Sequence, residues 1–223
     1  MEVINQHIDN LYNVFSEYTI QGKLRERSCY CCVIDEEIRQ LLSKPLKELT
    51  KKDISHFMTS AITTFGDLED YKHFLPRILE LMINNDNVLD DFLTYEKLNY
   101  SKWQKWEAKE ILPIKFYFKA LLIDALEKNK ESIDDCVLLN LKYNDFEMLS
   151  EILLNTNSEK FIKNIIENTL CTNAFPLDKR LTELFSDKKI LDKIEVLFFE
   201  ENDIIEANRI SIAYSILENE KNI

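Results

Sequence analysis

The sequence predicts an all-α fold of antiparallel helix pairs, stacked into an α-solenoid of the HEAT or armadillo kind with a right-handed superhelical path. Three observations carry this prediction. The 223 residues include only two Gly and four Pro, which leaves little material for hairpin turns or flexible linkers. Apolar residues recur at helical spacing in almost every window. Short polar connections separate the later segments, and such connections make successive helices antiparallel neighbours.

Caps and apolar spacing predict the helices of the first half. The expected segments are 4–18, which ends at Gly22; a short helix from Asp35 that stops before Pro45; 54–65, between a capping box at Thr50 and Gly66; 71–82, capped by Asp67 or Asp70; 88–98; and 103–125, capped by Ser101. Pro76 is expected to kink or restart its helix, and Pro113 to interrupt the longest one.

Six amphipathic segments are predicted in the second half. They cover 133–143, 146–154, 159–170, 177–185, 188–199 and 204–217. We treat 1–223 as a single all-α domain, with a possible subdivision into a motif-bearing part, 1–130, and a helical-repeat part, 131–223.

The charge balance narrows the classes of partner. There are 28 Lys and Arg against 40 Asp and Glu, a formal net charge of −12, and such a chain repels the nucleic acid backbone. The N-terminus lacks a basic region followed by an apolar core, and charged residues break the most apolar later stretch. Five Cys, an odd number, fit reduced thiols in a protein of this size. We therefore expect a cytoplasmic protein with no membrane segment and a basic or neutral partner.

Five short motifs follow one another between residues 29 and 122. They are Cys29–Cys32 (CYCC), Lys44–Thr50 (KPLKELT), Thr63–Gly66 (TTFG), Asp70–Arg77 (DYKHFLPR) and Lys97–Trp106 (KLNYSKWQKW). In this order and spacing the series resembles an uncharacterised bacterial protein family. The resemblance covers somewhat under half of the chain, and it implies no activity, cofactor or catalytic residue.

Cys29 and Cys32 form a C-x-x-C pair just after three basic residues, with Cys31 between them. Such a pair can supply half of a tetrahedral zinc site, and His56 and His73 are the residues that could complete it. The same thiols could be redox active, because nearby cations lower thiol pKa values. The alternative is that these cysteines merely pack or lie in a loop, so our primary expectation is no cofactor, with zinc as the alternative. Cys136 and Cys171 are expected on the apolar sides of their helices.

Two further groups are candidates for a functional surface. Asp70, His73 and Arg77 would share a helix face, where a carboxylate beside an imidazole is the minimum for acid–base chemistry. The alternative is a helix cap and an ion-pair ladder. Trp103 and Trp106 lie among lysines, a pattern that can bind single-stranded nucleic acid, but Trp at this spacing is more often in the core.

These observations favour a non-enzymatic, acidic helical-repeat module that binds a protein partner, of which an inhibitor or immunity protein is one case. The partner is expected to be basic, because acids cluster near the last two predicted helices. They are Glu195, Glu200, Glu201, Asp203 and Glu206. The alternative is a metal-binding or thiol-redox protein, or a small enzyme, centred on the loop from Cys29 to Cys32. For the five acidic residues themselves, the alternative to binding a partner is that they only maintain solubility.

Overall fold

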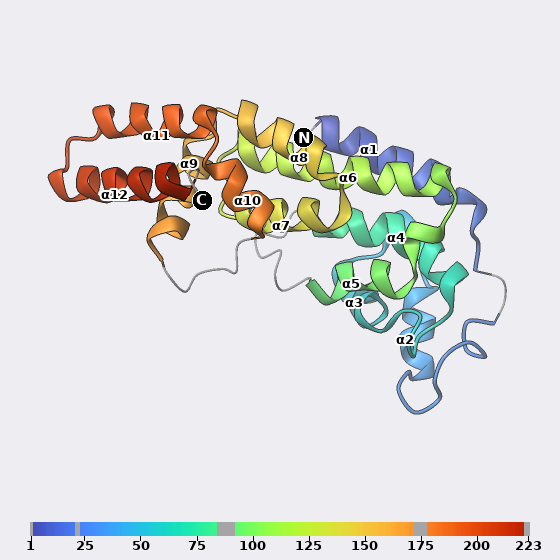
Figure 1. Cartoon of the computed structure of the whole chain (residues 1–223). Coiled ribbons are helices and arrows are strands. Elements are labelled where there is room, and N and C mark those ends of the chain that lie inside the picture. The colour runs from blue at the N-terminus through green and yellow to red at the C-terminus, as the bar shows by residue number, and fades with distance from the viewer. Residues whose placement is uncertain (1, 21–22, 84–91, 172–177, 221–223) are drawn as a thin grey trace. The chain divides into compact units, whose positions relative to one another are not determined.

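A computed structural model describes residues 2–20, 23–83, 92–171 and 178–220, and its regular elements are helices joined by turns and loops (Figure 1). Over those ranges there is no strand, only one isolated bridge between Ala61 and Phe65. The predicted all-α class is confirmed, whereas the HEAT or armadillo arrangement stays a prediction. By its internal contacts the chain divides into two compact units, 1–121 and 122–223. The division falls inside one helix, and the boundary expected near residue 130 stays a prediction.

The first unit holds six helices and three short 3-10 turns among its described residues. They are α1 (Glu2–Val14), η1 (Phe15–Glu17), α2 (Asp35–Leu41), η2 (Leu46–Glu48), α3 (Lys51–Ser60), α4 (Leu68–Met82), α5 (Phe92–Tyr100), η4 (Trp103–Lys105) and most of α6 (Ala108–Glu127). Two of the predicted N-terminal caps are confirmed. The Thr50 hydroxyl and the Asp53 carboxylate form a capping box on α3, and the Asp67 carboxylate caps α4.

The longest helix differs from its prediction. Ser101 does not cap it, because the Ser101 hydroxyl donates to the Leu98 carbonyl and Lys102 turns the chain through a left-handed conformation. The helix begins instead at Ala108, where the Glu110 carboxylate accepts from the Glu107 N–H. α6 then runs without a break through Pro113, as α4 does through Pro76. The expected ends at Gly22, Val88 and Leu177 lie outside the described residues.

The loops before α2 and before α4 are joined through the buried carboxylate of Asp70. Arg27 donates to it from Nε at 2.8 Å and from Nη2 at 2.6 Å, and the Asp67 N–H donates to it at 2.9 Å. Gly66 lies against this carboxylate with a φ of +69°, and an added Cβ would come within 2.8 Å of Asp70 Oδ2. Only glycine satisfies both the left-handed backbone and the close approach.

A second buried charge pair connects α4 to α6. Lys72 Nζ lies 2.6 Å from Glu110 Oε1, and the Tyr18 hydroxyl donates to the same oxygen at 2.6 Å. The ammonium also lies 4.4 Å from the centre of the Trp106 ring, a cation–π contact. Burial raises the pKa of the Glu110 carboxyl, but the hydrogen bonds from Lys72 and Tyr18 outweigh it and hold that pKa below its usual range. The Glu110 carboxylate therefore stays charged at neutral pH.

The second unit contains the end of α6 and six more helices among its described residues. They are α7 (Ile133–Tyr143), α8 (Phe146–Asn155), α9 (Glu159–Leu170), α10 (Lys179–Phe185), α11 (Lys188–Glu200) and α12 (Ile204–Glu220). α12 packs against both α9 and α11, and Figure 1 shows α11 and α12 side by side. Ile166, Ile194 and Ile210 are buried where these three helices meet. In the described part of the chain, no helix has the length and apolar character that crossing a membrane requires.

The two isolated cysteines have different environments. Cys136 is buried on α7, as expected. The expectation for Cys171 is wrong, because this residue follows the last turn of α9 as its C-cap and is exposed.

Replacing Lys72 with Met tests the buried charge pair. Removing one partner leaves the Glu110 carboxylate, 1% exposed, without its cation, so we expect the free energy of unfolding to fall by roughly 3–5 kcal/mol in urea denaturation. The double variant Lys72→Met/Glu110→Leu should recover part of this loss, because the unpaired charge is then absent. Lys105→Met, at an exposed position, is the control. A loss below about 1 kcal/mol for Lys72→Met, the value typical of a surface pair, would contradict the prediction.

Candidate functional site

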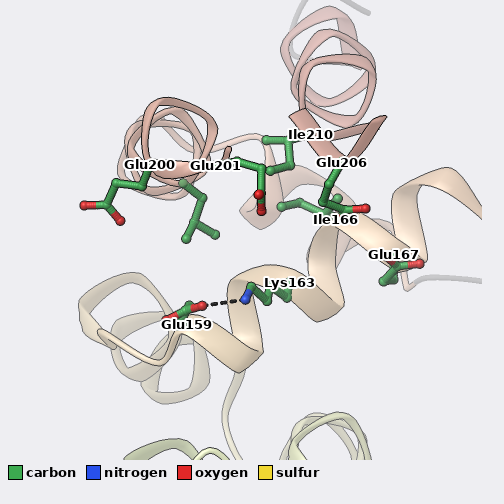
Figure 2. Close-up of a pocket in the computed structure, with 9 residues that line it drawn as sticks. Glu159, Lys163, Ile166, Glu167, Glu200, Glu201, Glu206 and Ile210 are labelled. Carbon is green, nitrogen blue, oxygen red and sulfur yellow. Dashed lines mark ion pairs between the residues drawn. The ribbon is translucent and has the colours of Figure 1, made fainter. Parts of the chain in front are cut away.

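An acidic cavity lies between α9, α11 and α12 in the second unit (Figure 2). Its volume is about 180 Å³. Its lining residues are Glu159, Lys163, Ile166, Glu167, Leu197, Glu200, Glu201, Glu206 and Ile210. Three apolar side chains are thus surrounded by five carboxylates and one ammonium group. We call this the acidic pocket.

Helix periodicity positions these side chains. Glu159, Lys163 and Glu167 follow one another at four-residue spacing and so share one face of α9. Glu200 is the last residue of α11 and Glu201 is its C-cap, while Glu206 lies in the first turn of α12. The Asp203 carboxylate accepts from the N–H groups of Ile205 and Glu206, which fixes the start of α12 beside the pocket.

Three of the five carboxylates are paired within the unit. Lys163 Nζ binds Glu159 at 2.5 Å, as Figure 2 shows. Arg209 donates to Glu167 at 2.7 Å and to Glu206 at 3.0 Å. The pKa of Lys163 is raised, first by its hydrogen bond to Glu159 and then by the charges of Glu159, Glu201 and Glu206. The field of the pocket therefore already favours a cation.

Glu200 and Glu201 differ from the other three carboxylates. Within the described residues, no Lys, Arg or His nitrogen lies within ion-pair distance of either one. Glu201 accepts only from backbone N–H groups, those of Asn202 and Asp203. Both also lie at the C-terminal end of α11, where the helix dipole disfavours negative charge. Their position costs stability that a bound cation would offset.

Exposed apolar side chains surround the turn between α11 and α12. Phe199 is 74% exposed, Ile204 79% and Ile205 74%. A cavity of about 210 Å³ beside them, lined in part by Phe198, Phe199 and Tyr214, shares Ile210 with the acidic pocket. α12 thus presents apolar residues to solvent as well as to the core, a pattern that in a surface helix marks an interaction site.

The first unit brings three thiols together. Cys29 Sγ lies 3.1 Å from Cys31 Sγ, which lies 3.7 Å from Cys32 Sγ, and all three sulfurs are within 4.8 Å of one another. One tight turn produces this cluster, because the N–H groups of Cys32 and Val33 both donate to the Cys29 carbonyl. Such a cluster could hold a metal ion. We call it the thiol cluster.

The cysteines of the thiol cluster differ in their pKa values. Hydrogen bonds from the Cys31 thiol and N–H, and then from Cys32, lower the pKa of Cys29 to about 7. Donation to Cys29 and then to Cys31 raises the pKa of the Cys32 thiol to about 11. Near pH 7, Cys29 is therefore partly ionised to the thiolate, whereas Cys32 remains a thiol.

The two histidines predicted as zinc ligands do not join the sulfurs. His56 Nδ1 lies 2.8 Å from a Glu37 carboxylate oxygen, and His73 Nδ1 donates to the Tyr18 carbonyl at 2.7 Å. Over the ranges that the structure covers, no histidine nitrogen or carboxylate oxygen comes within 4.8 Å of all three sulfurs. The structure brings Cys29 and Cys32 together with Cys31 instead.

The predicted functional surface is divided among separate contacts. Asp70, 2% exposed, pairs with Arg27, and Arg77 donates to the Leu49 carbonyl and to Glu80. Trp103 is buried, and the half-buried Trp106 donates from Nε1 to the Ser101 carbonyl. Asp70 and Trp103 therefore cannot form part of an exposed surface, because each fills the interior.

Sequence reasoning found part of each site. It singled out Glu200, Glu201 and Glu206, but not Glu159 or Glu167, whose spacing resembles that of any solvated helix face. Lys72 and Glu110 were also missed. The sequence gives one indication of each: Lys72 is a charged residue among apolar ones in the motif Asp70–Arg77, and Glu110 is one at the start of α6.

Comparisons with protein-family models, with curated proteins and with solved structures gave no match. The resemblance to an uncharacterised bacterial family therefore stays a prediction, and the sites rest on their own geometry.

Alkylation of Cys29 tests the proton distribution in the thiol cluster. Below pH 7 the thiol is protonated and unreactive, and above it the thiolate reacts, so the iodoacetamide rate at Cys29 should be half-maximal near pH 7. The variant Cys31→Ala/Cys32→Ala removes the thiol donors and should move that midpoint towards about 8.5. Mass spectrometry of the digested protein measures each cysteine separately. Equal midpoints in the two proteins would rule out stabilisation of the thiolate by its neighbours.

Proposed function

We propose that the protein is a non-enzymatic, acidic helical module that binds a basic protein partner through the acidic pocket, as an inhibitor or immunity protein would. The observation that carries the proposal is the pair Glu200 and Glu201. Neither carboxylate has an ion-pair partner among the described residues, and both lie at an unfavourable helix end. A Lys or Arg side chain of the partner would neutralise these carboxylates. Its positive charge would also interact favourably with the negative C-terminal end of the α11 dipole.

The surroundings of the pocket support a protein as the partner. Interfaces combine apolar anchors with a charged rim, and aromatic residues often dominate their binding energy. Phe199, Ile204 and Ile205 supply exposed apolar groups next to the carboxylates. We infer that a partner segment carries both basic and apolar side chains. All five cysteines are free thiols, which fits a reducing compartment, and we propose the cytoplasm.

Neutralising Glu200 and Glu201 tests the charged half of the proposal. A partner is captured from the producing cells by crosslinking, identified by mass spectrometry and purified. The variant Glu200→Gln/Glu201→Gln should then associate roughly tenfold more slowly at low ionic strength, with a weaker salt dependence, because complementary charge chiefly raises the encounter rate. Stopped-flow or biosensor kinetics at several salt concentrations measure this.

A matched control carries the same change of net charge elsewhere in the second unit. Glu147→Gln/Glu151→Gln alters two exposed carboxylates of α8 that do not line the pocket, and it should leave the association rate nearly unchanged. Phe199→Ala tests the apolar half, and it should weaken binding by about 2 kcal/mol, about 30-fold, mainly through faster dissociation. If the association rate depends neither on salt concentration nor on Glu200→Gln/Glu201→Gln, these acids serve solubility alone.

The alternative function is that of a metal-binding or thiol-redox protein centred on Cys29 to Cys32, with zinc as the metal. The proximity of three sulfurs supports it. Zinc in structural sites takes four ligands, so a ligand from outside the thiol cluster would have to complete the site.

Elemental analysis of the purified chain distinguishes the two functions. The interaction module predicts clearly less than one zinc per chain. One zinc per chain that is lost in Cys29→Ser/Cys32→Ser would favour the metal-binding function, because these thiolates would then be ligands.

A further inference from the structure

We propose that Cys29, Cys31 and Cys32 bind one monovalent copper ion through three thiolates. This inference concerns the first unit and is independent of the partner proposed for the second. It replaces the sequence-based expectation of no cofactor, and it differs from the zinc alternative in the number and kind of ligands.

The sulfur geometry suits a single small ion. Four sulfurs bound to zinc at about 2.3 Å would lie about 3.8 Å from one another, which gives the scale for thiolates that share one metal. Here the neighbouring sulfurs are 3.1 and 3.7 Å apart, and no pair exceeds 4.8 Å. Small side-chain rotations therefore suffice to place an ion between them.

The ligand count selects the metal. Soft thiolates favour monovalent copper, zinc or iron–sulfur clusters. Structural zinc sites need four ligands and iron–sulfur clusters usually take four cysteines. In the part of the chain that the structure describes, the group holds three sulfurs, and no His nitrogen or carboxylate oxygen lies within 4.8 Å of all of them. A soft ion that accepts three sulfur ligands fits without a ligand from elsewhere.

The backbone holds the three thiols before any metal binds. The Cys29 N–H donates to the Thr64 carbonyl at 2.7 Å, and Arg25 Nη2 donates to the Cys29 carbonyl at 2.9 Å. Arg25 also donates to the Val33 carbonyl at 2.6 Å, which closes the turn that carries the cluster. Cys31 and Cys32 are exposed, so an ion can enter and leave without unfolding.

Coordination releases protons from the cluster. Each thiol loses its proton to solvent as its sulfur–copper bond forms, without any change in oxidation state. Binding should therefore strengthen as pH rises, because protons compete with the metal for sulfur.

The test uses the full chain, reduced and free of oxygen, titrated with monovalent copper against bicinchoninate, a chromophoric chelator. We expect one equivalent of copper to be withheld from the chelator, with a first shell of sulfur alone in X-ray absorption spectra. Cys31→Ser should weaken copper binding at least tenfold, because it removes a direct ligand. Cys171→Ser, which alters another exposed cysteine in the second unit, should leave it unchanged.

Two results would overturn the proposal. One is copper binding that is equally tight in Cys31→Ser and in the unaltered chain, since Cys31 would then not be a ligand. The other is one equivalent of zinc that displaces copper, shows nitrogen in its first shell and is lost in His56→Ala, which would support the four-ligand zinc site. Far-UV circular dichroism of each variant establishes that its helices are intact.

Discussion

The buried carboxylate of Asp70 is the constraint on which the first unit depends. A carboxylate that is 2% exposed must be paired, and Arg27 supplies the charge from the loop before α2. That pairing draws the loop onto the start of α4, where the Ser28 hydroxyl accepts from the Gly66 N–H. The Cys29 backbone then bonds to Thr64, and the thiol cluster follows directly. The pair of Arg27 and Asp70 thus helps to hold the loop that carries the thiols.

The same reasoning gives the motif series a structural interpretation. The segment TTFG supplies the glycine that Asp70 requires, and Arg77 of DYKHFLPR holds the carbonyl of Leu49 in KPLKELT. Lys72 of the same motif contacts Trp106 of the last one. These contacts link the motifs to one another, which stabilises a single arrangement of loops. The motif residues that make these contacts stabilise the first unit. The interaction proposed for the protein lies elsewhere, at the acidic pocket.

The two units differ in how their charged side chains are paired. In the first, buried ions are matched, as Lys72 and Glu110 show. In the second, Glu200 and Glu201 stay unmatched beside exposed Phe199. A protein tolerates such an arrangement at the surface because water solvates the carboxylates, at a smaller cost than a buried charge would carry. The arrangement becomes favourable when a cation with apolar neighbours replaces that water.

The sequence by itself determined the all-α class and nearly all helix bounds of the second half, because periodicity, caps and polar connections act within a few residues. It also indicated Cys29, Cys32 and the acids after α11. Only the tertiary structure decided which groups meet. Lys72 and Glu110 are 38 residues apart and Arg209 and Glu167 are 42 apart, and no local pattern encodes such pairs. The exclusion of His56 from the thiol cluster and the completion of the acidic pocket by α9 likewise depend on packing between distant helices, which burial energy determines over the whole unit.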